Sequence, residues 1–166
     1  VVLTHKNIIT QVRGAGLFFP LKPKSDSAFS SLPMAHIFER MVMYYYISTG
    51  ISIYFADDIQ KIGERVKEVH PTIMTVVPRL LEKVYAKMTG SIQSSGGLKG
   101  LIGKVALKAL QTEKGKSSVM FKLYDHLVYA KLREAMGGRL RMVISGAAAL
   151  DSAICQFFID VGIEVY

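Results

Sequence analysis

Short runs of β-branched and aromatic residues alternate along the chain with longer segments whose apolar residues recur every three or four positions. The first pattern is typical of buried strands and the second of amphipathic helices. Because strands and helices follow one another in turn, the sequence predicts an α/β fold, with a mostly parallel sheet and flanking helices. The expected strands cover residues 27–34, 51–55, 72–77, 140–145 and 163–166.

Residues that favour helix ends mark the boundaries of the helical segments. Thr4 is expected to cap the first helix, and Gly14 and Gly16 are expected to end it. Pro78 suits the first position of a helix, and Asp151 suits an N-cap. The expected helices cover residues 5–14, 37–48, 59–69, 78–88, 101–112, 117–136 and 152–161.

The middle of the chain interrupts this alternation. Residues 90–100 are rich in Ser and Gly, so we expect a flexible loop there, at the start of a helical insert at about 90–137. Ten of the 21 lysines and arginines lie between Lys99 and Arg141, against three acidic residues, so this stretch carries nearly all of the formal net charge of +8. The charge favours either an anionic partner, such as a phosphate-rich ligand or a membrane surface, or a solvated basic face.

Composition limits where the protein is expected to work. Of the 166 residues 50% are apolar, which is enough for a sizeable core, and Cys155 is the only cysteine, so no internal disulfide can form. We therefore expect an intracellular protein, cytoplasmic or peripheral on a membrane. Residues 41–56 carry no charge, but they are fewer than the roughly 20 that span a bilayer, so no transmembrane span is predicted. Apolar sequence at both ends predicts a fragment of a longer protein.

Common catalytic signatures are missing from the sequence, which has no phosphate-loop, dinucleotide-binding or serine-hydrolase motif and no metal-spaced Cys/His set. The stretch LPMAHIFER places His36 where a predicted strand ends and a helix begins. Ligands of open parallel sheets bind at this edge, and an imidazole there can hydrogen-bond an anionic or carbonyl group. A core histidine satisfied by the backbone is the alternative. Glu39 and Arg40 beside it are expected to form a structural ion pair.

Two further segments have both a functional and a structural interpretation. The turn 145–149, with the sequence SGAAA, also follows a strand and opens a helix, so a flat ligand could approach its backbone closely, with Gly146 allowing unusual φ and ψ angles. The alternative is a tight packing turn. Tyr44, Tyr45 and Tyr46 could line an apolar tunnel or could belong to the core.

Four stretches together resemble a known family. They are VVLTHKNI at the start, LPMAHIFER, VVPRLLEKVY at 76–85 and GGRLRMVISGAAAL at 137–150, and they follow the order and spacing found in long-chain fatty acyl-CoA synthetases. The resemblance runs over residues 1–166 and implies a partial AMP-binding (adenylate-forming) domain, truncated at both ends. The insert at about 90–137 also resembles the long-chain branch.

The resemblance implies a reaction and a set of substrates. Family members use ATP and Mg²⁺ to convert a fatty acid into an acyl-adenylate, which the thiol of CoA then attacks. His36 would lie beside the acyl carboxylate. Met34, Tyr45 and Tyr46 would border the acyl tunnel.

The resemblance also implies where the nucleotide binds and what the chain lacks. Gly146, Ala147 and Ala148 would lie against the adenine and the adenylate. The phosphate loop, the magnesium ligand and the catalytic lysine of the family fall outside this sequence. The chain is therefore expected to contain no catalytic residue and no metal site, and to be inactive alone.

Other functions remain open at this point. A non-catalytic module could bind acyl chains or an anionic membrane through the basic insert, where Lys104 and Lys108 share a helical face near Leu101, Ile102 and Val105. A ligase of the same superfamily that loads an acyl-carrier protein instead of CoA is a further alternative. Nucleic-acid binding is not expected, since nothing beyond the net charge favours it.

Overall fold

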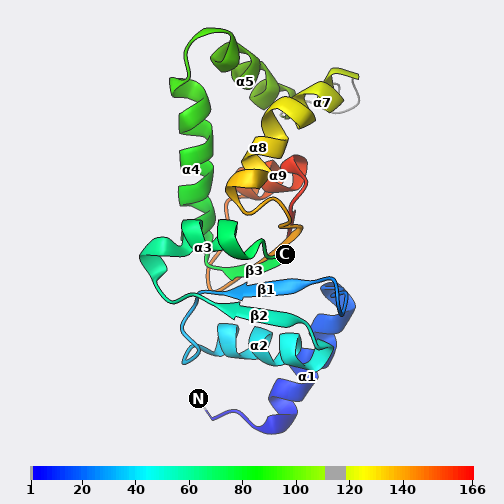
Figure 1. Cartoon of the computed structure of the whole chain (residues 1–166). Helices are drawn as coiled ribbons and strands as arrows, with labels where there is room; N and C mark the ends of the chain where they lie inside the picture. The colour runs from blue at the N-terminus through cyan, green and yellow to red at the C-terminus, as the bar shows by residue number, and fades with distance from the viewer. Residues whose placement is uncertain (1, 111–118) are drawn as a thin grey trace.

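The computed structural model describes residues 2–110 and 119–166, and its centre is a five-stranded sheet with the order β2-β1-β3-β4-β5 (Figure 1). Every pairing between neighbouring strands is parallel, which confirms the predicted α/β class. The strands are shorter than predicted and cover Ser27–Ser30 (β1), Ser52–Phe55 (β2), Ile73–Val76 (β3), Met142–Ser145 (β4) and Glu164–Val165 (β5).

Helices cover both faces of the sheet, and the residues of each strand alternate between two apolar clusters. Ala28, Ile73 and Met142 are in register and pack under α2 (Ile37–Thr49), and α1 (His5–Phe18) packs against α2. On the other face, β1, β3 and β4 pack under α3 (Ile62–Val69), α4 (Pro78–Ser94) and α9 (Ser152–Val161). A parallel sheet covered on both faces requires strands that are buried along their whole length, as β3 is, and the polar side chain in β3, Thr75, is 0% exposed.

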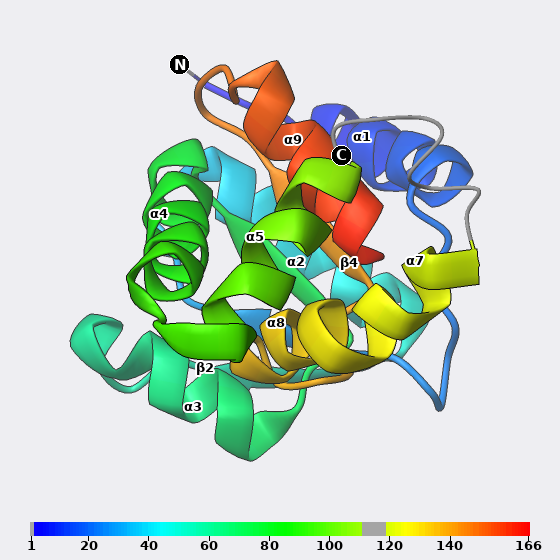
Figure 2. The same ribbon diagram turned by 90° about the horizontal axis from the view of Figure 1, so that it is seen from above.

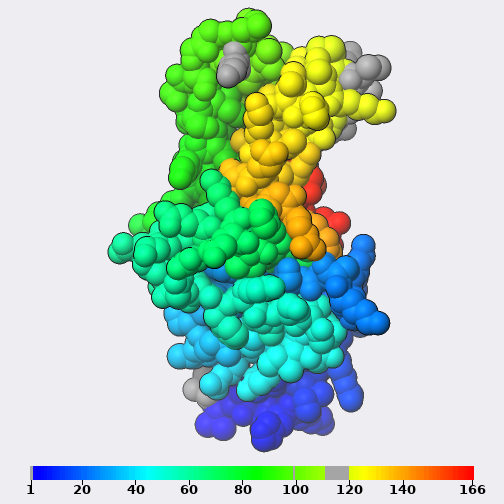
Figure 3. All heavy atoms as spheres, in the orientation of Figure 1, coloured from blue at the N-terminus to red at the C-terminus, as the bar shows by residue number. Residues whose placement is uncertain are grey.

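The insert consists of helices that rise from the sheet at the end opposite the N-terminus (Figures 1 and 3). Its elements are α5 (Gly97–Leu110), α7 (Val119–Tyr124), a π-helix η2 (Asp125–Tyr129) and α8 (Ala130–Ala135). Seen from above, α5 lies beside α4 and over α8 (Figure 2). Within the insert, the Tyr129 hydroxyl of η2 donates a hydrogen bond to the carbonyl of Ala106 in α5 at 2.8 Å. The predicted helix boundaries at 112 and 117 lie outside the described residues.

The flexible loop predicted for residues 90–100 is wrong. Helix α4 continues to Ser94, and α5 begins at Gly97, so only two residues separate them. The hydroxyl groups of Ser91, Ser94 and Ser95 donate to carbonyls three or four residues earlier, so the polar side chains are satisfied within the helix. Ile92 packs against the core and holds this last turn in place.

Two glycines do not end α1 as predicted, because the helix runs through both of them to Phe18. The N-cap predicted at Thr4 is present, and Asn7 completes a capping box there. Gly16 lies against the ring of Tyr45, where an added Cβ would be 3.7 Å from that ring. Packing against α2 therefore extends the helix beyond the point at which local preference would stop it.

Other helices also begin or end at residues that favour such ends, and the ends predicted at Pro78 and Asp151 agree with the structure. Gly50 ends α2 with a φ of 70°, Asp58 caps the short 3₁₀ helix η1 (Ile59–Lys61) that precedes α3, and Asp151 caps α9. Pro78 is the first residue of α4. Within residues 2–110 and 119–166, no helix combines the length and apolar character that crossing a membrane requires.

Candidate functional site

The carboxyl ends of β1, β3 and β4 meet at one edge of the sheet, because the three strands run parallel. A cavity of about 120 Å³ lies at this edge. The segment after β1 and the turn after β4 therefore face the same space, as expected for a ligand site in an open α/β sheet. The cavity is lined by Leu32, Pro33, His36, Phe38, Glu39, Val77 and Ala147.

His36 is the N-cap of α2 and is exposed to solvent. Its Nδ1 accepts a hydrogen bond from the backbone N–H of Phe38 at 3.3 Å. A neutral imidazole that accepts at Nδ1 holds its proton at Nε2, so His36 offers one N–H donor to a ligand. The core-histidine alternative is wrong, because the ring is not buried.

The turn after β4 combines close packing with an accessible backbone. An added Cβ on Gly146 would lie 2.5 Å from the ring of Phe38, so only glycine fits under α2 here. The unusual φ expected at Gly146 belongs instead to Ala147, at 69°. Ala147 and Ala148 are both exposed, which leaves the backbone of the turn open to a flat ligand.

Glu39 lies in the first turn of α2 and is 0% exposed. The Ser30 hydroxyl donates a hydrogen bond to its Oε1, whereas Oε2 has no partner among the described residues. Burial raises the pKa of this carboxyl, and the Ser30 hydrogen bond offsets only part of the effect. The predicted ion pair with Arg40 is wrong, since Arg40 points to solvent while Glu39 faces Ser30. The signal for burial was present in the helical spacing of Glu39 from Val42, Met43 and Tyr46, all of which are buried.

The structure does not bring Tyr45 and Tyr46 to the wall of this cavity. The Tyr46 hydroxyl lies 2.8 Å from Thr75 Oγ1 in the interior, and burial raises the pKa of this phenol. The Tyr45 hydroxyl donates to the carbonyl of Phe19 at 2.5 Å, which joins α2 to the loop after α1. Met34 is 40% exposed in the turn before His36.

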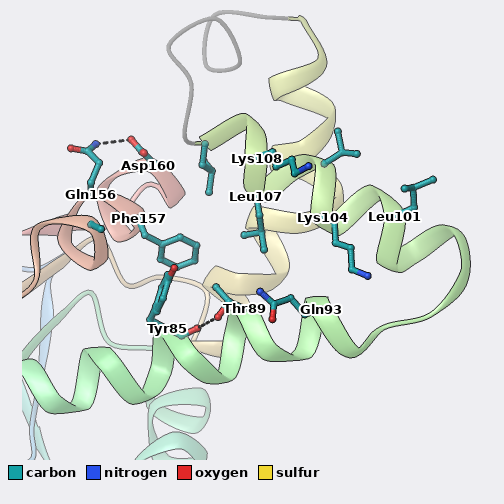
Figure 4. Close-up of a pocket in the computed structure, with 13 residues that line it drawn as sticks. Tyr85, Thr89, Gln93, Leu101, Lys104, Leu107, Lys108, Gln156, Phe157 and Asp160 are labelled. Carbon is teal, nitrogen blue, oxygen red and sulfur yellow. Dashed lines mark hydrogen bonds between the residues drawn. The ribbon is translucent and has the colours of Figure 1, made fainter.

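A second, larger cavity of about 1050 Å³ lies between α4, α5 and α9 (Figure 4). Its floor includes Tyr85 and Phe157, whose rings meet edge to face at 4.9 Å. Lys104 and Lys108 line it from α5, together with Leu101. The residues predicted for the acyl and nucleotide sites are absent from its wall, so it is separate from the edge of the sheet. Its wall does include Leu101, Lys104, Val105 and Lys108 of the helical face predicted in the basic insert.

The donor set at the edge of the sheet does not fit a magnesium ion. In the described part of the chain, no group of three or more His, Cys, Asp or Glu side chains could hold a metal. Glu39, the one carboxyl in the wall of the 120 Å³ cavity, has an elevated pKa, which is the opposite of what a metal ligand needs.

Comparisons with known proteins show the family to which the chain belongs. The chain is 33% identical over 162 residues to long chain acyl-CoA synthetase 6, peroxisomal, of Arabidopsis thaliana, a match that covers 95% of this chain and 22% of that protein. It is 32% identical over 163 residues to long-chain-fatty-acid–CoA ligase 5 of Mus musculus, covering 95% of this chain and 23% of the relative. The chain thus spans less than a quarter of the length of these curated relatives.

The fold is also that of solved adenylate-forming enzymes. The A-PCP didomain of carboxylic acid reductase from Segniliparus rugosus, solved in complex with AMP, superposes with a TM-score of 0.68 at 20% identity, over 98% of this chain and 20% of that one. The sequence profile described as "AMP-binding enzyme" matches residues 1–166. The resemblance to long-chain fatty acyl-CoA synthetases is therefore confirmed, and the chain belongs to the AMP-binding enzyme family.

Proposed function

We propose that this chain is part of an ATP-dependent long-chain fatty acid–CoA ligase and supplies one wall of its acyl and nucleotide sites. The observation that carries the proposal is the cavity at the carboxyl edge of the sheet, which His36 and Ala147 share. Similarity to long-chain acyl-CoA synthetases along 95% of the chain supports the choice of substrates.

The reaction has two steps in this proposal. A carboxylate oxygen of the fatty acid attacks the α-phosphorus of ATP, and pyrophosphate leaves. The sulfur of CoA then attacks the carbonyl carbon of the acyl-adenylate, the thiol gives up its proton, and AMP leaves. The mixed anhydride is a far better acyl donor than the carboxylate, which is the purpose of the first step.

His36 and the turn after β4 have separate roles in this scheme. The Nε2–H of His36 donates to a carboxylate oxygen and orients the acyl group, without acting as a base. Gly146, which is half-buried, and the exposed Ala147 and Ala148 present a small-residue backbone to the adenine. Magnesium is proposed for the whole enzyme only, since the described residues give it no ligands.

The acyl chain itself is proposed to leave the cavity past Met34, the exposed side chain in the turn before His36. Tyr45 and Tyr46 would not touch the acyl chain. They would support its path indirectly, because their hydrogen bonds to Phe19 and Thr75 fix the position of α2. Met34→Asp would then weaken palmitate binding without weakening ATP binding, because a carboxylate would face the methylene groups.

The full-length protein that contains this chain tests the proposal. Incubation with ATP, Mg²⁺, palmitate and CoA is expected to give palmitoyl-CoA, AMP and pyrophosphate, measured by mass spectrometry. A parallel reaction with a pantetheine-bearing carrier protein decides between the two acceptors. No acyl-thioester from the full-length protein with either acceptor would contradict the assignment. The chain alone is expected to be inactive.

A second candidate function is supported by the surface of α5. Leu98, Leu101 and Val105 are exposed on this helix at 73%, 60% and 43%, beside the exposed Lys104 and Lys108. Ile102, which was expected to join them, packs against the core instead. Exposed apolar residues flanked by lysines are typical of a helix that lies on an anionic membrane.

Sedimentation with lipid vesicles tests this membrane contact. Binding to vesicles containing phosphatidylserine, but not to phosphatidylcholine alone, is expected, and high salt should reverse it. Replacing Lys104 and Lys108 by Glu should abolish binding, whereas Lys61→Glu on η1 should not. Equal binding of all variants would show that the face of α5 is not the contact.

A further inference from the structure

The wall of the 120 Å³ cavity contains two side chains with polar groups, His36 and Glu39. His36 can only donate a hydrogen bond to a ligand. His36 accepts at Nδ1 from the backbone of Phe38, so its remaining function is the Nε2–H donor. The rest of the wall is apolar and comes from Leu32, Pro33 and Val77, among others. The second polar side chain is Glu39.

The surroundings of Glu39 favour a neutral carboxylic acid. It is fully buried, and Ser30 is the hydrogen-bond partner that the structure gives it in the described chain. Isolated carboxylates are costly to bury, so burial favours the protonated form of a carboxyl in this position. Because the Ser30 hydroxyl donates to Oε1, that oxygen is the carbonyl oxygen of the acid, and the proton belongs on Oε2.

An O–H on Oε2 is a donor that the described protein leaves unsatisfied. A buried donor without an acceptor costs free energy, and native structures keep very few of them. Glu39 and His36 belong to the wall of one cavity, where apolar side chains surround them. Two donors and an apolar wall suit a group that only accepts hydrogen bonds and continues into a hydrocarbon chain, which describes a fatty carboxylate.

We propose that Glu39, as the neutral acid, is a second carboxyl-binding donor of this site and holds one oxygen of the fatty acid while His36 holds the other. The inference rests on the function proposed above and deepens it. Ser30 is the positioning residue, since its hydrogen bond fixes which oxygen of Glu39 carries the proton. A charged Glu39 would repel the same substrate.

Two substitutions in the full-length enzyme separate donation from charge and size. Glu39→Gln keeps a donor at this position and an acceptor for Ser30. Glu39→Met keeps the volume but has no donor. We expect Glu39→Met to raise the Kd for palmitate, measured without ATP, by about 10-fold or more, and Glu39→Gln to stay within about threefold of the unsubstituted enzyme. The Kd for ATP should not change in either variant.

A matched control lies at the other end of the sheet. Thr72→Val also removes a buried polar group, one that bonds to Asp26 at 2.9 Å. This variant is expected to lower the melting temperature and leave the Kd for palmitate unchanged. A Glu39→Met enzyme that binds palmitate normally would overturn the proposal, and so would equal weakening by Gln and Met.

Infrared difference spectra keep the proposal testable if Glu39→Met does not fold. The unsubstituted enzyme should show the C=O band of a protonated carboxyl group, and this band should be missing in Glu39→Gln. The band should shift when palmitate binds. Palmitate labelled with ¹³C at its carboxyl group is used so that its own bands are distinguished from that of Glu39. Absence of that band, or a band that palmitate leaves unmoved, overturns the proposal. An unsubstituted enzyme that neither binds palmitate nor forms palmitoyl-CoA refutes the proposed function itself, and the inference with it. An active enzyme with a normal Glu39→Met variant refutes the inference alone.

Discussion

Two carboxyl groups are buried at opposite ends of strand β1, and they are treated in opposite ways. Asp26, 6% exposed, precedes the strand and accepts hydrogen bonds from Arg141, Thr72 and the backbone N–H of Lys22. Glu39, which is fully buried, lies beyond the other end of the strand, and Ser30 bonds to one of its two oxygens. The protein supplies hydrogen bonds to both oxygens of Asp26, whereas one oxygen of Glu39 has no hydrogen-bond partner among the described residues.

The difference separates an end that stabilises the fold from the end at which we propose that a ligand binds. Around Asp26, burial alone would raise the pKa, but the hydrogen bonds from Arg141, the Lys22 backbone and Thr72 outweigh it and lower the pKa of this carboxyl. Around Glu39, burial dominates and the pKa rises. A buried network with every hydrogen bond made fixes a structure, whereas a buried polar group without a partner marks a candidate functional site. The loop carrying Asp26 also receives a hydrogen bond at the Pro20 carbonyl from Arg141, at 2.9 Å.

The largest expected effect on stability comes from disrupting the hydrogen-bond network around Asp26. Asp26→Asn removes the charge that faces Arg141 at 2.5 Å and leaves the guanidinium partly buried without its counter-ion. We expect a loss of about 2 to 4 kcal/mol in the free energy of unfolding, measured by urea denaturation of the chain. Asp57→Asn, at an exposed ion pair with Arg65, is the matched control and should leave the midpoint unchanged. Equal effects of the two substitutions would show that the network at Asp26 is no stronger than a surface pair.

Acid should reproduce part of this loss. The pKa of Asp26 is lowered from its ordinary value of 3.8, so the folded state binds its proton less readily than the unfolded state does. The stabilisation is therefore complete above about pH 4 and is lost as the pH falls through the lower, folded-state value. Urea midpoints measured across the acid range should fall more steeply for the unsubstituted chain than for Asp26→Asn. Parallel curves would place the acid sensitivity at another group.

The two ends also differ in what the sequence can reveal. The candidate binding edge was predictable, because His36 and the turn at Gly146 each follow a run that reads as a strand, and parallel strands bring such positions together. The network at Asp26 was not, since Arg141 is 115 residues away along the chain and nothing local marks the pair. Local signals also misled at Gly14, Gly16 and Gly90, which all lie inside helices despite the helix-ending tendency of glycine. At Gly16 the ring of Tyr45 packs against the helix.

Glu39 shows a third kind of failure. Its neighbour Arg40 suggested an ion pair, but adjacent residues of a helix point about 100° apart and do not face each other. Helical periodicity places Glu39 inside with Val42 and Tyr46, although a carboxyl is seldom buried without a charged partner. Residues that break a local rule in this way mark candidate functional sites.

A smaller effect is expected at the binding edge, from filling the space beneath α2. Gly146→Ala puts a methyl group 2.5 Å from the Phe38 ring, so the ring or the turn must move. We expect the Kd of the full-length enzyme for AMP to rise about fivefold or more, and Phe38→Leu in the same protein to restore part of the affinity. Gly63→Ala, where an added Cβ meets nothing within 4 Å, is the control. Unchanged AMP binding in Gly146→Ala would mean that the nucleotide does not use this turn.

The smallest expected effect concerns Glu39, whose contribution to stability should depend on pH in the opposite direction to that of Asp26. The pKa of Glu39 is raised from its ordinary value of 4.5, so the folded state binds the proton more tightly than the unfolded state. Its contribution to stability is complete below about pH 4.5 and is lost as the pH rises through the folded-state value. Glu39→Gln cannot ionise, so this chain should match the unsubstituted one in acid and exceed it in alkali, by roughly 1 kcal/mol. The urea midpoints of both chains should coincide in acid, and the midpoint of Glu39→Gln should become the higher of the two as the pH rises. If they diverge in acid instead, Glu39 is ionised in the fold, and the contrast between the two ends of β1 disappears.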